Sequence, residues 1–391
     1  MNENLNNKLT DLIAKAENEK ERRSLIQITF KLAKEDFISP QCKKTLSEFI
    51  TDKADSETLT SGQFEPPEQL YTYLAYQMYK EGICGEKNPK EAKKYLLKMV
   101  KHHKYYACKE LLLAYRDGNA ELDIAADKDA MIEWCFKIAD YGSPTYLYFL
   151  ALQAAGKNVP EFYDLGVEKD LKLAIRCLNK LNEDVNNFFS ICDELDTMLN
   201  YTVHEIFREH SSDMYGRARD SFVDGLKRDF WDCTGYSHIR MASPHLINLL
   251  GVVYYELGDY ENAAKTFERA VLYESLGGKL NLSDMYSNGI GVPQDKEKAF
   301  NMKKEIADLF VGNQLGDMWD LSYDEEPKLL ETVEYIANAY RFGIGVQQSS
   351  ENASKYYSIL TDHFWTLHLP ADFEDTIVQR ASTALKEMSS S

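Results

Sequence analysis

Residues 283–299 read SDMYSNGIGVPQDKEKA, and this stretch decides the fold because its spacing returns at two other places in the chain. Segment 76–92 reads YQMYKEGICGEKNPKEA, and segment 337–353 reads ANAYRFGIGVQQSSENA. In all three, a tyrosine precedes a glycine by three residues and an alanine follows that glycine by ten. The residues are, in chain order, Tyr79, Gly82 and Ala92, then Tyr286, Gly289 and Ala299, then Tyr340, Gly343 and Ala353. Self-similarity of this kind predicts a repeat architecture.

Each part of the motif has a physical role in a helical hairpin. The glycine stands where an apolar helical period stops, and ending a helix there requires a left-handed conformation that costs glycine little. A few residues later, Asn88, Pro89 and Glu91 supply an N-cap, a first-turn proline and a capping-box acid. Asp295 supplies the corresponding cap in a later unit, and such a cap contributes about 1 kcal/mol. The alanine lets two helices approach to about 8–10 Å, so the unit is helix, tight loop, helix.

These units resemble Sel-one-like repeats, whose pattern is a small-residue and Leu/Tyr-rich first helix, G-x-G-V, an acidic cap, and K-A with an aromatic residue in the second helix. The matching residues are Gly289, Ile290, Gly291 and Val292 with Lys298 and Ala299, and Gly343, Ile344, Gly345 and Val346 with Ala353, Tyr356 and Tyr357. The unit at 76 departs from the pattern, because Cys84 and Gly85 replace the second glycine and the valine. Its loop is therefore expected to run differently.

A fourth unit, 244–275, resembles the related tetratricopeptide repeat more closely. The signature positions are Leu250, Gly251, Tyr254, Ala263, Phe267 and Ala270. Two weaker units, 108–142 and 147–180, have altered loops. Their matching residues are Leu112, Tyr115, Gly118, Ala130, Trp134, Ala139 and Gly142 in the first, and Leu150, Gly166, Val167 and Ala174 in the second.

Several segments lie outside the repeats. Helical periodicity without glycine punctuation predicts two helices within residues 1–60, where a terminal cap is expected to cover the end of the array. They are marked by Leu9, Leu12, Ile13 and Ala16, and by Leu25, Ile28, Leu32 and Ala33. Residues 58–67 have linker composition, residues 308–327 are acidic and aromatic and predict a loop or short insertion, and residues 372–387 predict a final helix.

The resemblance and the periodicity together predict an all-α fold, a right-handed α-solenoid of helix-turn-helix repeats with an N-terminal helical cap and a helical insertion. The predicted order is cap (1–60), divergent Sel-one-like repeats (68–184), helical insertion (185–243), tetratricopeptide-like and Sel-one-like repeats (244–365), and C-terminal helix with tail (371–391).

Composition narrows the class of partner. The chain has 45 basic and 63 acidic residues, a net charge of −18, and a surface of that sign repels phosphate backbones, so nucleic acid is not the expected partner. No stretch approaches 18 uncharged apolar residues, and the N-terminus lacks the pattern of a secretory signal. Seven cysteines without a CxxC pair fit reduced thiols. A cytoplasmic protein is expected.

No catalytic, cofactor or metal site is predicted. His204 and His210 invite a zinc-protease interpretation, but six residues on a helix turn the second ring roughly 240° from the first, whereas such a site needs a spacing of four. The sequence contains no G-x-S-x-G, G-x-x-x-x-G-K-[ST] or G-x-G-x-x-G motif. Acidic pairs occur in runs that are typical of solvated faces. The chain is therefore predicted not to be an enzyme.

The resemblance implies that the first helices of the pairs line a concave groove that holds a peptide or protein surface. Spacing from the anchoring tyrosine then predicts the partner-facing side chains: Gln77, Lys80, Lys109, Arg116, Asn248, Tyr255, Asp284, Ser287, Asn338 and Arg341. A carboxylate clamp is not expected in the fourth unit, because Asn248 is followed one turn later by Val252 and not by lysine. The overall acidity favours a basic or neutral protein surface.

Two hypotheses for function follow. The first is an interaction scaffold or adaptor whose groove recruits a protein, as bacterial Sel-one-like proteins often do in signalling, envelope or host-interaction pathways. The second is a ligand-binding or enzymatic module built by the 185–243 insertion, with a pocket around Arg217, Arg219, Trp231 and His238.

Overall fold

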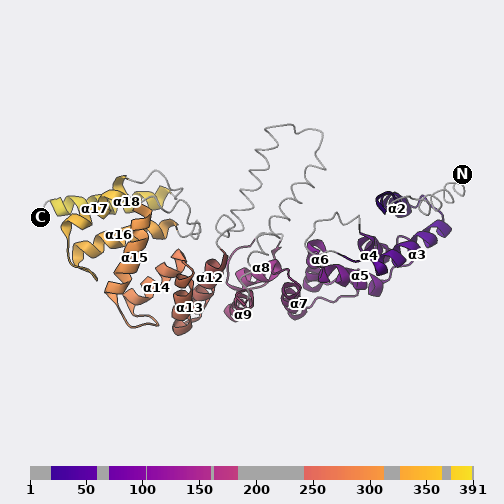
Figure 1. Ribbon diagram of the computed structural model, residues 1–391, viewed down its shortest axis with the longest axis horizontal. Coiled ribbons are helices and arrows are strands. Elements are labelled where there is room, and N and C mark those ends of the chain that lie inside the picture. Colours follow the sequence, from indigo (N-terminus) through magenta and orange to yellow (C-terminus); the bar gives the residue numbers. More distant parts are fainter. Residues whose placement is uncertain are drawn as a thin grey trace, which may run out of the picture. The chain divides into compact units, whose positions relative to one another are not determined.

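The structure is a computed structural model that describes residues 19–59, 70–102, 104–159, 163–183, 242–311, 326–362 and 371–389. Within these ranges the secondary structure is helical, apart from one isolated bridge between Asn119 and Ile124. The predicted all-α class is confirmed: consecutive helices pack in pairs joined by short loops (Figure 1). The chain divides into two compact units, Met1–Leu150 and Ala151–Ser391. Among the helices of the described part, none is both long and apolar enough to cross a bilayer.

The first unit contains three successive helix pairs. Its helices are α2 (Glu19–Lys34), α3 (Pro40–Ser56), α4 (Tyr71–Glu81), α5 (Pro89–Lys101), α6 (Tyr105–Asp117), the short 3₁₀ helix η2 (Ala120–Leu122) and α7 (Lys128–Asp140). The division between the two units falls inside α8 (Thr145–Ala154).

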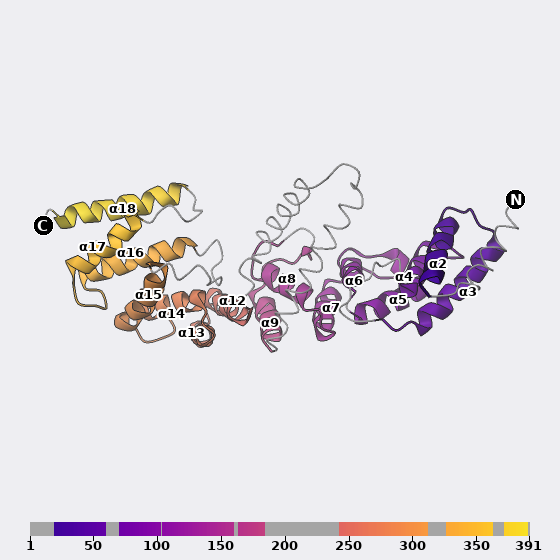
Figure 2. The ribbon, with the colours of Figure 1, turned by 45° about the horizontal axis from the view of Figure 1, so that its top comes forward.

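In the part of the chain that the structure describes, the second unit contains α9, three helix pairs and a final helix. They are α9 (Leu171–Leu181), α12 (Ala242–Leu257), α13 (Tyr260–Leu272), α14 (Leu276–Asn288), α15 (Lys296–Val311), α16 (Glu326–Phe342), α17 (Ser350–Asp362) and α18 (Ala371–Ser389). From α12 to α18 each helix packs against the next one along the chain, and α18 lies beside both α17 and α16 (Figure 2).

The three glycine-punctuated loops share one backbone geometry, as the sequence predicts. The first glycine of each loop is left-handed, with φ of 75° at Gly82, 68° at Gly289 and 71° at Gly343. The amide of each following cap residue donates to the carbonyl of the tyrosine nine residues earlier. The donor and acceptor residues are Asn88 and Tyr79 (2.8 Å), Asp295 and Tyr286 (2.9 Å), and Ser349 and Tyr340 (2.9 Å). This bond closes the loop and fixes where the second helix begins.

The second glycine of the G-x-G pair has a different role, which is contact with the preceding pair. A Cβ atom built on Gly291 would lie 2.4 Å from the carbonyl oxygen of Tyr260, the first residue of α13. A Cβ atom on Gly345 would lie 2.1 Å from the carbonyl oxygen of Lys296, the first residue of α15. The loop therefore packs directly on the backbone at the start of the previous second helix. Gly85 has open space around it and no positive φ, so the loop at 76–92 runs differently, as expected.

Tyrosines also join neighbouring pairs. In α5, Tyr95 stacks on Tyr79 of α4 and donates to Asp55 of α3 at 2.9 Å. In α17, Tyr356 stacks on Tyr340 of α16 and donates to Asp308 of α15 at 2.5 Å. The helix α3 therefore makes the same contact with the first repeat that α15 makes with the last one.

The N-terminal and connecting segments were predicted less completely. Two helices were predicted in residues 1–60. The second of them is α2, and the first lies outside the described residues. The helix α3 was not predicted, because its sequence marks a helix start through a cap but lacks a strong apolar period. Ser39 accepts from the Cys42 amide at 3.2 Å, and Pro40 occupies the first turn. The 185–243 insertion lies outside the described residues. The interruption at 308–327 is shorter than predicted, since α15 continues to Val311 and α16 begins at Glu326, and the final helix is confirmed as α18.

Removing the cap of α15 tests how much this helix start contributes. The amide of Lys298 donates to the Asp295 carboxylate at 2.9 Å. We expect Asp295→Ala to lower the free energy of unfolding by about 1 kcal/mol, while Asp295→Asn retains the cap and most of the stability. Urea denaturation followed by circular dichroism measures both. Equal losses in the two variants would show that the carboxylate charge, and not the cap, matters at this position.

Candidate interaction groove

Polar side chains link the first helices of neighbouring pairs on the face that the sequence predicted for a partner. In the first unit, Lys80 of α4 forms an ion pair with Glu110 of α6. In the second unit, the Asn281 side-chain amide of α14 donates to Asn248 of α12 at 2.9 Å. Between α16 and α18 the same kind of link occurs twice and leaves an open groove.

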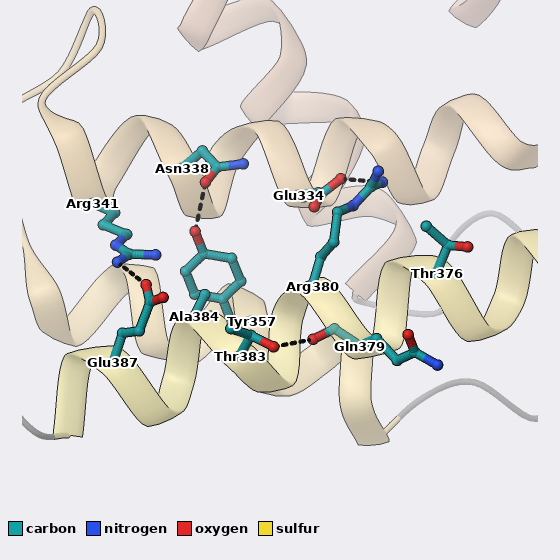
Figure 3. Close-up of a pocket in the computed structure, with 10 residues that line it drawn as sticks. All are labelled: Glu334, Asn338, Arg341, Tyr357, Thr376, Gln379, Arg380, Thr383, Ala384 and Glu387. Carbon is teal, nitrogen blue, oxygen red and sulfur yellow. Dashed lines mark hydrogen bonds and ion pairs between the residues drawn. The ribbon is translucent and has the colours of Figure 1, made fainter.

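This groove has a volume of about 520 Å³ and is formed by α16, α18 and one side chain of α17 (Figure 3). Its lining side chains are polar or charged with one exception, an alanine. They are Glu334, Asn338, Arg341, Tyr357, Thr376, Gln379, Arg380, Thr383, Ala384 and Glu387. Two of them, Asn338 and Arg341, are residues that tyrosine spacing predicted to face a partner.

Two ion pairs cross the groove with opposite polarity. Arg341 of α16 pairs with Glu387 of α18 at 2.7 Å, and Glu334 of α16 pairs with Arg380 of α18 at 2.8 Å. Both pairs join residues 46 apart in the sequence, so the two helices run in the same direction with matched charge spacing. The α16 partners are the more buried: side-chain exposure is 15% for Glu334 and 24% for Arg341, against 51% and 59% for the α18 partners.

The middle of the groove is held by a tyrosine and an asparagine. The buried Tyr357 hydroxyl donates to Asn338 Oδ1 at 2.6 Å, and burial raises the pKa of Tyr357, so this hydroxyl stays protonated and remains a donor. The hydrogen bond with Glu387, and a second one with Tyr357, raise the pKa of Arg341. Asn338 Nδ2 is turned away from Tyr357 (Figure 3), and no bond from it occurs within the described residues. The groove thus offers two fixed charges and an amide donor between them.

In the first unit the predicted residues lie close together on α4 and α6. The Gln77 amide donates to the Tyr73 hydroxyl at 2.9 Å, and Lys80 lies over the Tyr76 ring. Lys109 is half-buried, and burial, followed by the nearby Arg116, lowers its pKa. Arg116 itself makes two hydrogen bonds to the neighbouring Asp117, at 2.7 and 2.8 Å. Three of the four predicted residues are therefore cationic.

In the second unit the remaining predicted residues are more scattered. Asn248 is only 6% exposed and is used in the contact with α14. Tyr255 is 39% exposed and meets Tyr260 edge to face, with ring centroids 5.1 Å apart. Asp284 is exposed and pairs with Lys303 at 2.5 Å. The backbone carbonyl of Ser287 accepts from the Gln294 side chain at 2.9 Å.

Sequence reasoning missed the groove residues contributed by α18 and the acid that begins the pattern on α16. Glu334 stands seven residues before Arg341, and Arg380 stands seven before Glu387. This matched spacing could have predicted the two ion pairs from the sequence. The prediction requires that α18 be treated as the first helix of a further pair and not as a terminal helix.

The proposed ligand pocket of the alternative hypothesis, Arg217, Arg219, Trp231 and His238, lies outside the described residues, as do His204 and His210. Within the described part of the chain, no three histidine, cysteine or acidic side chains come together as a metal site.

Comparison with known families gives matches to the Sel1 repeat, at residues 71–102, 147–183 and 278–302. The first and third matches include the loops at 76–92 and 283–299. The second covers the weaker unit at 147–180 and confirms it as a repeat. No curated protein matches the chain.

Several solved structures resemble the chain, including the following two. A Sel1 repeat protein from Oxalobacter formigenes is 15% identical, with 98% of this chain and 89% of that chain covered and a TM-score of 0.29. The protein c5321, a protective antigen present in uropathogenic Escherichia coli strains and displaying an SLR fold, is 13% identical, with 95% and 87% covered and a TM-score of 0.25. TM-scores this low do not allow a site to be inferred from these structures. The candidate site is therefore described from the geometry of this chain alone.

Proposed function

We propose that this chain, a Sel1 repeat protein, is a non-catalytic scaffold that binds a partner protein through the face formed by its first helices. Sel1 repeats generally act as protein–protein interaction scaffolds. The observation that carries the proposal is the groove between α16 and α18, which is open and polar and contains two residues predicted to face a partner, Asn338 and Arg341. Hydrogen-bonding and charged groups at the surface of a rigid helical pair suit recognition of another chain.

Charge supports a protein and not a nucleic acid as the partner. The net charge of −18 opposes the approach of phosphate backbones, whereas it steers basic or neutral protein surfaces toward the chain. The groove carries both signs of charge in equal number, so a partner segment with both signs is the complementary one.

A reducing compartment fits the cysteines of the proposed scaffold. Within the described residues, no disulfide involves Cys42, Cys84, Cys108, Cys135 or Cys177. Burial raises the pKa of Cys84 to about 11 and that of Cys177 to about 12, so both stay protonated and unreactive. We place the scaffold in the cytoplasm on this basis.

Reversing one groove charge tests the proposal. We expect Arg341→Glu to reduce recovery of the bound protein at least about tenfold in affinity capture from the native host, because arginines are frequent energetic hot spots of interfaces. The matched control is Lys328→Glu, which makes the same charge reversal at an exposed position of α16 outside the groove lining. Circular dichroism confirms that both variants are folded.

Identical sets of recovered proteins from the wild type and Arg341→Glu would contradict the proposal. So would a metabolite that raises the melting temperature while no protein is recovered, since that result indicates a ligand-binding module.

A further inference from the structure

The spacing of the two partly buried charges of α16, Glu334 and Arg341, restricts what can bind between them. Glu334 and Arg341 are seven residues apart on one helix, and a rise of 1.5 Å per residue separates them by about 10.5 Å along the axis. A single ligand that satisfies both must present a cation and an anion at about that distance on one side.

A polyproline II segment meets this requirement. It has three residues per turn and a rise of about 3.1 Å, so side chains three apart point to the same side at about 9.3 Å, and flexible side chains absorb the remaining difference. A β-strand places side chains three apart on opposite faces. A partner helix with charges seven apart spans the same distance of about 10.5 Å, so a helical peptide is the competing ligand that the test below has to separate from a polyproline II segment.

The existing ion pairs can open at little cost to admit such a segment. Arg380 and Glu387 are 51% and 59% exposed, and exposed ion pairs contribute only about 0–1 kcal/mol each. A basic side chain of the ligand would replace Arg380 at Glu334, and an acidic one would replace Glu387 at Arg341. Both α16 charges then remain paired after binding.

Asn338 lies between the two charges and supplies a contact to the ligand backbone. Its Oδ1 accepts from Tyr357, which fixes the orientation of the amide and directs Nδ2 away from that ring. Carbonyl groups of a polyproline II segment make no internal hydrogen bonds, so one of them is available to accept from Nδ2.

We infer that the groove between α16 and α18 binds a polyproline II segment of the partner that carries one basic and one acidic side chain three residues apart. This inference rests on the proposed function and specifies the segment that the scaffold recognises.

The test uses capped synthetic peptides of the two possible orders, Lys-Pro-Pro-Glu and Glu-Pro-Pro-Lys, each flanked by glycine, and measures binding to the full chain by isothermal titration calorimetry. We expect one order to bind at least about tenfold more tightly than the other. It should also bind more tightly than a peptide with the same charges two residues apart.

Exchanging the groove charges provides the decisive variant. Glu334→Arg with Arg380→Glu, combined with Arg341→Glu and Glu387→Arg, restores both ion pairs with reversed polarity, and we expect it to prefer the opposite peptide order. The control exchange is Glu261→Lys with Lys265→Glu, an exposed pair of α13, which should leave the preference unchanged. If the fourfold variant is unfolded by circular dichroism, the single exchange at Arg341 and Glu387 is tested with peptides that carry one charge. We then expect the exchange to weaken binding of the acidic peptide and to strengthen binding of the basic one.

An unchanged preference after the exchange would overturn the inference. So would the absence of binding by either peptide, or tighter binding of a helical peptide with charges seven apart. If these results occur while protein capture still depends on Arg341, the inference fails and the scaffold function stands. If capture is also independent of Arg341, the proposed function fails as well.

Discussion

Replacing Gly345 by alanine is expected to destabilise the second unit far more than the same change at Gly343, two residues earlier in the same loop. Both glycines are left-handed, with φ of 67° and 71°, so each alanine carries a backbone strain of about 1 kcal/mol. The surroundings differ. A Cβ atom on Gly343 meets nothing closer than 3.6 Å, whereas one on Gly345 would lie 2.1 Å from the Lys296 carbonyl oxygen. That oxygen is backbone at the start of a helix and has no alternative rotamer.

The expected difference is the cost of separating the loop from α15. Overpacking of a closely packed contact costs about 1–3 kcal/mol beyond the strain, so the total for Gly345→Ala is about 2–4 kcal/mol against about 1 kcal/mol for Gly343→Ala. Urea unfolding of both variants, followed by circular dichroism, gives the two values. Hydrogen exchange should locate the extra loss in α15, α16 and α17. Equal losses in the two variants would show that the second glycine serves only the conformation of its own loop.

The repeat unit and its loops were predictable from sequence because their determinants are local. A left-handed glycine and a cap act within about ten residues, and the tyrosine carbonyl accepts from a residue nine positions later, so the spacing of Tyr286, Gly289 and Asp295 already contains the loop geometry. The contact that Gly291 makes with Tyr260 is not local. This contact depends on how one helix pair stacks on the previous pair. The sequence pattern shows that a glycine recurs at position 291, but it does not show that the backbone of Tyr260 lies against it.

The groove was predictable only in part for the same reason. Spacing from Tyr340 identified Asn338 and Arg341, which lie on the same helix as that tyrosine. Glu387 and Arg380 were missed because they reach the groove from a helix 46 residues further on. The same spacing rule also selected a residue that a partner cannot reach. Asn248 has the spacing of a partner-facing residue on α12, but it contacts Asn281 of α14 and is only 6% exposed.

Truncating Phe267 is expected to have the largest effect of any single change in the fourth unit. This ring is 1% exposed and packs in a cluster with Ala263 and Met285. Removing a buried phenylalanine side chain costs about 3–5 kcal/mol through lost burial and the cavity left behind. Leu272 provides a matched control on the same helix, because it is 82% exposed and its replacement by alanine should change stability by no more than about 0.5 kcal/mol. Urea unfolding measures both variants.

The same ring explains why residue 251 is glycine, and the two positions should therefore be coupled. A Cβ atom on Gly251 would lie 2.4 Å from a ring carbon of Phe267, so Gly251→Ala alone should cost about 1–3 kcal/mol by overpacking. In the double variant Gly251→Ala with Phe267→Ala, the clash disappears and the added methyl fills part of the cavity. We expect the double variant to lose at least about 1 kcal/mol less than the sum of the two single losses. Strict additivity in this cycle would mean that α12 and α13 relax apart around the new methyl group, and that their close approach does not depend on glycine at this position.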